Sequence, residues 1–78
     1  MKSYVIKHEP SNTFVSFSDE IGPISVPLDN AQLFSLDIVK DIMNPDFFGL
    51  AYIEGIDNEI VPEDISVYEV EITLLNKI

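Results

Sequence analysis

The sequence contains no cysteine, no tryptophan, a single histidine and only three glycines in 78 residues. Without cysteine the chain forms no disulfide and offers no thiolate to a metal, as is typical of proteins in a reducing compartment. The single histidine, His8, leaves no second imidazole for a triad or metal site, and beside Glu9 at a strand end it is predicted to lie on the surface. The glycines are isolated and form no phosphate-binding loop. We therefore expect no enzyme activity, no cofactor and no metal.

Long apolar runs are absent as well. No run approaches the roughly 18 residues that a membrane-spanning helix needs, and the first residues lack the apolar core of a signal peptide. We expect a cytoplasmic protein that does not bind membranes. The length predicts one small domain over residues 1–78, since a chain this short buries only about 60–65% of the surface that its unfolded form exposes. Hydrophobic residues make up 46% of the chain, which is too much for a disordered segment.

Basic residues are few compared with acidic ones. Four lysines stand against 14 acidic residues, so the formal net charge is −10. Residues 41–78 hold nine of the acids and only one base, Lys77. Such a surface repels nucleic acid and anionic membrane and attracts basic partners. We therefore expect a basic protein surface as the partner and no direct nucleic-acid binding, although acidity that serves only solubility has the same composition.

Three short strands are predicted in the first third of the chain. Residues 4–8 and 13–17 are rich in β-branched and aromatic residues, and the turn residues between them, 9–12, predict a hairpin. A break at 19–23 precedes a third strand over 24–26. This strand stands between two prolines, which cannot donate to a ladder, and therefore belongs at a sheet edge.

One helix is predicted over residues 36–43. Ser35 is the expected N-cap, and Phe34 and Val39 occupy the two positions of a hydrophobic staple. Pro45 ends the helix because the residue before a proline avoids the α region. The residues expected on the inward face are Ile38, Val39, Ile42 and Met43.

Two further strands are predicted after the helix, one central over residues 49–54 and one over 65–74. Because side chains alternate along a strand, one set of the last strand is expected to close the core and the other to face water. The core set is Tyr68, Val70, Ile72 and Leu74, and the water-facing set includes Glu69 and Glu71. The order β-β-β-α-β-β predicts the α+β class: an antiparallel four- to five-stranded sheet with one helix packed on one face.

The row of carboxylates on the last strand is the main functional signal. Glu69 and Glu71 are separated by about 6.8 Å along the strand, similar to neighbouring phosphates of a nucleic-acid strand. A protein with such a row can occupy the Lys/Arg groove that a nucleic-acid-binding protein keeps for phosphate. The solvent-facing side of any antiparallel sheet gives a similar row, and the oxygens of residues 57–64 leave a calcium site as another alternative. The candidate partner-binding residues are Asp57, Glu59, Glu63, Asp64, Glu69 and Glu71.

Two adjacent aromatic residues, Phe47 and Phe48, follow the helix and cannot both point inward. One of them is expected to cap the core. The other either lies half-covered or serves as a surface anchor for a partner, because buried aromatics dominate the energetics of interfaces.

The layout of roughly two thirds of the chain resembles that of small acidic proteins encoded by tailed bacteriophages. In those proteins a strand similar to Tyr4-Val5-Ile6-Lys7 opens a hairpin, a step similar to Ala31-Gln32-Leu33-Phe34-Ser35 leads into one helix, and the last strand is acidic. Some of them inhibit host defence, including anti-CRISPR proteins that imitate nucleic acid. The resemblance and the charge together imply a non-catalytic counter-defence inhibitor of the host cytoplasm. It would act as a monomer or homodimer and block the nucleic-acid-binding surface of a host nuclease complex.

Two other functions fit the same sequence. An immunity protein that neutralises a basic toxin needs a similar acidic clamp. A structural or assembly protein of a phage particle would instead associate with copies of itself through an edge strand.

Overall fold

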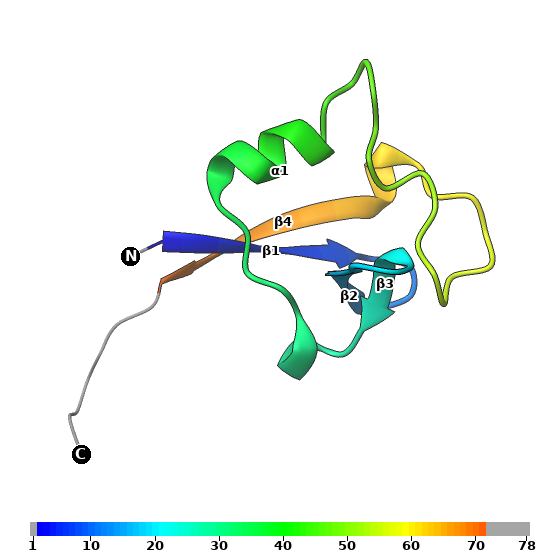
Figure 1. Ribbon diagram of the computed structural model, residues 1–78, viewed down its shortest axis with the longest axis horizontal. Helices are drawn as coiled ribbons and strands as arrows, with labels where there is room; N and C mark the ends of the chain where they lie inside the picture. Colours follow the sequence, from blue (N-terminus) through cyan, green and yellow to red (C-terminus); the bar gives the residue numbers. More distant parts are fainter. Residues whose placement is uncertain (1, 72–78) are drawn as a thin grey trace.

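The computed structural model describes residues 2–71, which form a four-stranded antiparallel sheet and one short α-helix (Figure 1). The predicted α+β class is confirmed, and the sheet has the strand order β3-β2-β1-β4. The first and last strands of the described chain therefore lie side by side. The elements in chain order are β1 (Lys2–His8), β2 (Thr13–Ser18), β3 (Gly22–Val26), the 3₁₀ turn η1 (Leu28–Asn30), α1 (Leu36–Ile42), the 3₁₀ turn η2 (Pro62–Asp64) and β4 (Ile65–Glu71).

The predicted hairpin joins β1 to β2, but the two strands are paired only near its turn. Lys7 pairs with Phe14 and His8 with Thr13. Within the turn Asn12 has a φ of 56°, a left-handed conformation that asparagine tolerates better than most residues. Beyond these two pairs β1 and β2 separate, which leaves a gap in the backbone ladder.

The chain between η1 and α1 fills this gap. Phe34 exchanges two backbone hydrogen bonds with Tyr4 of β1, at 2.8 and 2.9 Å. On the other side, the Gln32 side-chain oxygen accepts a 2.7 Å hydrogen bond from the backbone N–H of Phe17 in β2. The rings of Phe17 and Phe34 then meet edge to face, with centroids 5.8 Å apart. Residues 32–34 thus satisfy backbone groups that the separated strands leave open.

The helix begins as the sequence predicts. The Ser35 hydroxyl accepts a 3.3 Å hydrogen bond from the backbone N–H of Ile38, which confirms the N-cap. Phe34 and Val39 are both buried in one cluster, as a hydrophobic staple requires. The prediction that Ile38 points inward is wrong, because this residue is 47% exposed. Consecutive helical residues are about 100° apart around the axis, so a helix that buries Val39 turns Ile38 outward.

The predicted strand over residues 49–54 is wrong. Residues 43–61 form an irregular segment whose backbone pairs with the sheet at one isolated bridge, between Glu54 and Ile24 of β3. Leu50 and Ile53 are both fully buried. Two residues three apart face opposite sides of a strand, so burying both on one core requires a non-extended backbone. The three-residue spacing of Leu50 and Ile53 indicates this non-extended backbone, whereas the high apolar content of residues 49–54 suggested a strand.

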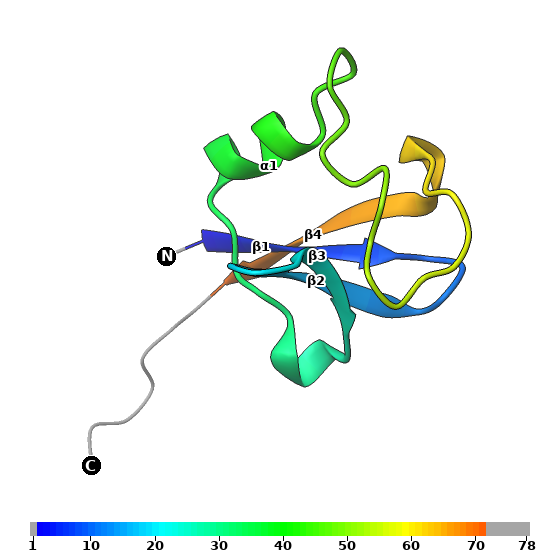
Figure 2. The same ribbon diagram turned by 45° about the vertical axis from the view of Figure 1, so that its right-hand side comes forward.

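One core joins the sheet, the helix and the irregular segment. In both views α1 lies above β1 and β4, and the segment that follows it runs along the other end of these strands (Figures 1 and 2). The buried cluster consists of Ile6, Val15, Phe34, Val39, Leu50, Ile53, Ile60 and Ile65. The irregular segment thus supplies a large share of the core.

The strand β4 faces the core with the opposite set of residues from the predicted one. Ile65 is buried in the core, and Val67 lies directly opposite the fully buried Ile6 of β1. Residues directly opposite each other in an antiparallel pair share a face, so the odd-numbered residues of β4 are on the core side. Tyr68 therefore points to the other face and is 45% exposed.

This reversal also moves the acidic residues of β4. Glu69 and Glu71 lie on the core side of the sheet, but beyond the apolar cluster, where both remain exposed. Val70 shares the outer face with Tyr68 instead of closing the core. The predicted core positions of Ile72 and Leu74 lie outside the described residues.

Replacing Ile53 by alanine should lower the free energy of unfolding by about 2–5 kcal/mol, because a fully buried side chain leaves a cavity. Phe47→Ala, in the same segment but 80% exposed, is the control and should change it by less than about 0.5 kcal/mol. Urea denaturation followed by circular dichroism measures both. Two equally small effects would show that residues 43–61 unfold apart from the sheet.

Candidate partner-binding surface

The six candidate carboxylates lie along β4 and in the segment that leads into it. Glu63 and Asp64 belong to η2, and Asp57 and Glu59 belong to the irregular segment after Gly55. The backbone places Asp64 firmly, since its carbonyl accepts a 2.9 Å hydrogen bond from the Glu9 N–H. Asp64 is half-buried, whereas the other candidates are exposed. The surface is therefore accessible to a partner at nearly all of its predicted positions.

Within this surface, the carboxylates before β4 are separated from those near its end. Asp64 and Glu69 are five residues apart along extended chain, which is about 17 Å. The structure therefore does not gather the candidates into a single cluster. No three histidine, aspartate or glutamate side chains among residues 2–71 lie close enough to hold one metal ion. The calcium alternative thus has no set of ligands in the described part of the chain.

Glu69 is paired with a lysine from the neighbouring strand. Its Oε1 lies 3.1 Å from Lys2 Nζ, and the hydrogen bond between them raises the pKa of Lys2. Both side chains are about half exposed or more, so the pair contributes little to stability and can open for a partner. Glu71 lies opposite Lys2 in the ladder but makes no ion pair within residues 2–71.

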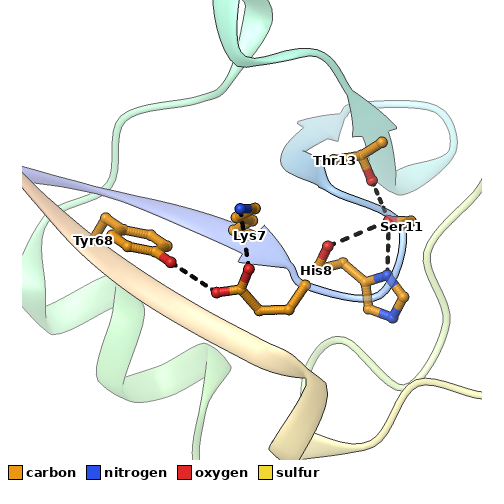
Figure 3. Close-up of polar contacts among 6 residues, drawn as sticks. Lys7, His8, Ser11, Thr13 and Tyr68 are labelled. Carbon is orange, nitrogen blue, oxygen red and sulfur yellow. Dashed lines mark hydrogen bonds and ion pairs between the residues drawn. The ribbon is translucent and has the colours of Figure 1, made fainter.

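A second charged group lies on the outer face of the sheet, where β1 and β4 run side by side (Figure 3). Glu9 Oε1 lies 3.0 Å from Lys7 Nζ, and Glu9 Oε2 accepts a 2.7 Å hydrogen bond from the Tyr68 hydroxyl. Lys7 Nζ also lies 5.9 Å from the ring centroids of Phe14 and Tyr68. Sequence reasoning missed this group because it depends on the pairing of β1 with β4.

These contacts hold Glu9 in its charged form. Hydrogen bonds from Tyr68, Ser66 and Lys7 lower the pKa of Glu9 to about 2. The same hydrogen bond raises the pKa of Tyr68 from its usual value of 10.0, since ionising the phenol would place a negative charge beside the carboxylate. The charge of Glu9 is thus matched within the fold, whereas on the candidate surface only Glu69 has a lysine partner among residues 2–71.

The predicted surface position of His8 is wrong, because its side chain is only 5% exposed. Its Nδ1 lies 2.8 Å from the Ser11 hydroxyl, which in turn lies 2.6 Å from the Thr13 hydroxyl (Figure 3). The Ser25 hydroxyl donates to Thr13 Oγ1 at 2.8 Å, so the chain of hydroxyls connects the hairpin turn to β3. A nucleophilic triad needs a carboxylate on the far side of the imidazole, and none of the described hydrogen bonds supplies one. The group therefore has the geometry of a structural clasp.

The two adjacent aromatic residues take different environments. Phe48 packs against the core, whereas Phe47 is 80% exposed, far more than a half-covered side chain. Backbone hydrogen bonds from Phe47 to Asn44 and from Gly49 to Ile42 close this loop, at 3.1 and 2.8 Å. Phe47 is thus held outward by an ordered turn.

No helix within residues 2–71 combines the length and the apolar character that crossing a membrane requires. Comparisons with protein-family models, curated proteins and solved structures found no match. What this surface can do therefore follows from its charge and geometry.

Replacing Glu9 by glutamine should lower the pKa of Tyr68 towards 10.0, because the neutral amide no longer opposes ionisation of the phenol. The absorbance of the phenolate during a pH titration measures this change, and a Tyr68→Phe variant identifies the step that belongs to Tyr68. Tyr52, whose pKa is raised by its hydrogen bond to Glu54, should titrate unchanged and serves as the internal control. An unaltered Tyr68 step would contradict the Glu9–Tyr68 contact.

The same substitution should change the acid stability. A carboxylate whose pKa falls from 4.5 to about 2 on folding stabilises the protein above pH 4.5, and this contribution is lost as the pH falls through about 2. As the pH falls from 4.5 to about 2, Glu9→Gln should therefore lose less unfolding free energy than the wild type. Glu20→Gln, at an exposed turn position, removes the same charge and is the matched control for the loss of one carboxylate. Identical curves for Glu9→Gln and wild type would count against the lowered pKa.

Proposed function

We propose that this protein is a non-catalytic inhibitor that binds a basic protein surface through the carboxylates of β4 and of the segment before it. The observation that carries the proposal is the excess of unmatched charge in this part of the chain. Of the nine acidic residues after position 40, all of which lie within the described chain, only Glu69 is ion-paired to a lysine there. Unmatched surface carboxylates raise the rate and specificity of association with a basic partner.

The spacing of the charges favours a partner that normally binds nucleic acid. Glu69 and Glu71 project from the same side of a paired strand, about 6.8 Å apart, which approximates the spacing of neighbouring phosphates. Proteins that bind nucleic acid line their grooves with lysine and arginine for such phosphates. A strand already fixed in the sheet presents its carboxylates without a further loss of backbone conformational entropy on binding.

The most specific form of the proposal is a phage counter-defence protein of the anti-CRISPR type, which blocks the nucleic-acid-binding surface of a host nuclease complex. The exposed Phe47 is consistent with a protein partner, because an aromatic side chain on an ordered turn can fill an apolar pocket. The phosphate backbone of a nucleic acid offers no such pocket.

Reversing the charge of Glu69 and Glu71 to lysine should abolish capture of the partner. The tagged protein is incubated with host lysate at low salt, and the bound proteins are identified by mass spectrometry. We expect the wild type to retain a nucleic-acid-binding complex that is released by added DNA or RNA. Salt near 1 M should release it too, since the Debye length there is only about 3 Å.

The matched control carries the same change of charge in the turn between β2 and β3, as Asp19→Lys with Glu20→Lys, where both residues are exposed. This variant should still capture the complex. Equal capture by the two double variants would remove β4 from the binding surface. Failure of the wild type to retain any nucleic-acid-binding protein at either salt would refute the proposed function.

A further inference from the structure

The strand β4 forms one edge of the sheet, and its outer side has no backbone partner among residues 2–71. The opposite edge is different. There the Ser25 N–H of β3 donates to the Glu54 carbonyl at 2.8 Å, and the Glu54 N–H donates to the Pro23 carbonyl at 2.9 Å. The irregular segment thus protects the β3 edge, whereas no segment within residues 2–71 covers the β4 edge. An open edge is a template for a further strand.

The ladder with β1 decides which groups of β4 point outward. Hydrogen-bonded and non-hydrogen-bonded pairs alternate in an antiparallel ladder. Glu9 is bonded to Asp64, whereas both backbone groups of Tyr4 are used by Phe34 on the far side of β1. Tyr4 and its partner Glu69 therefore form a non-hydrogen-bonded pair, and the N–H and C=O of Glu69 point away from the sheet.

The same alternation applies along the rest of the strand. The N–H and C=O groups of Val67 and Glu71 also point outward, whereas Ser66, Tyr68 and Val70 are bonded to β1. The side chains of Val67 and Glu69 are 37% and 49% exposed, so this stretch of the edge is accessible from solvent.

We propose that an extended basic segment of a partner protein adds to β4 as a further strand. Backbone hydrogen bonds to residues 67, 69 and 71 supply the docking, and alternate side chains supply the specificity. Residues beside Glu69 and Glu71 are lysine or arginine, and residues beside Tyr68 and Val70 are apolar. The partner segment therefore alternates basic and apolar residues. This inference rests on the proposed function, since it names how the basic partner docks.

A second copy of this chain fits the edge poorly. Pairing β4 antiparallel with another β4 through its outward-facing residues brings each carboxylate opposite either another carboxylate or an apolar side chain such as Val67 or Ile65. No such register gives Glu69 or Glu71 a basic neighbour. Two molecules with a net charge of −10 also repel each other at long range.

Amide hydrogen exchange tests the proposal directly. The probe is a synthetic peptide in which lysine and valine alternate, and the control is a peptide of the same composition with all lysines in one block. In the free protein the amides of residues 67, 69 and 71 should exchange fast and those of 66, 68 and 70 slowly. The alternating peptide should slow the first set, while the block peptide should leave it fast and bind about tenfold more weakly.

A proline at position 69 separates the backbone from the side chain. Glu69→Pro removes one outward N–H and leaves the bonds to β1 intact, because proline is tolerated at an edge position whose N–H faces solvent. Glu69→Gln removes the same charge but keeps the N–H. We expect Glu69→Pro to bind the alternating peptide about tenfold more weakly than Glu69→Gln. Circular dichroism tests whether both variants fold. If Glu69→Pro does not fold, the exchange pattern of the wild type with the two peptides decides the question.

Three results would overturn the proposal. The first is protection of the amides of residues 67, 69 and 71 in the free monomer, which would show that the chain itself occupies the edge. The second is protection of these amides when the free protein dimerises, and the third is equal binding of the two peptides. Separately, capture of the same nucleic-acid-binding complex by Glu69→Pro and Glu69→Gln alike would refute strand addition while leaving the proposed function intact. Failure of the wild type to capture any nucleic-acid-binding complex would refute the proposed function itself.

Discussion

The insertion of residues 32–34 between β1 and β2 is the constraint on which the rest of the structure depends. Phe34 bonds to the backbone of Tyr4, packs edge to face on Phe17, and forms the staple with Val39. One residue thereby fixes the opening between the strands, the direction in which the chain enters α1, and the face of the sheet that the helix covers. Because the helix and the segment after it cover that face and the β3 edge, β4 pairs with the strand edge that remains among residues 2–71, which is that of β1.

Signals that are local in the sequence predicted the elements that local chemistry decides. The hairpin turn, the N-cap at Ser35 and the staple follow from neighbouring residues and are confirmed. The inward set of β4 is different, because alternation defines two sets of residues but not which one meets the core. That choice depends on the register with β1, which puts Ile65 beside His8, 57 positions earlier in the chain. The buried position of His8 follows from the same register, since it shares a face with Ile6.

The acidic residues show the same division between what composition decides and what pairing decides. Unpaired carboxylates are rarely buried, so the exposure of most candidates follows from their chemistry. Which carboxylate pairs with a lysine does not follow from that chemistry. Glu9 is matched by Lys7 and held by Tyr68 from β4, whereas Glu69 meets Lys2 only because β1 begins where β4 ends. The separation of Asp64 from Glu69 follows from the extended backbone between them, which the predicted strand over residues 65–74 already implied.

Solubility and recognition are alternative explanations for the charge of a surface patch, but at an open strand edge they have the same physical origin. Natural proteins place charged side chains on free edges because a like-charged copy cannot add to them. The protection is selective by sign: a carboxylate beside an unpaired N–H and C=O disfavours another acidic strand and favours a basic one. On β4, the residues that would keep molecules of this protein apart, Glu69 and Glu71, are therefore the same residues that would admit a basic partner.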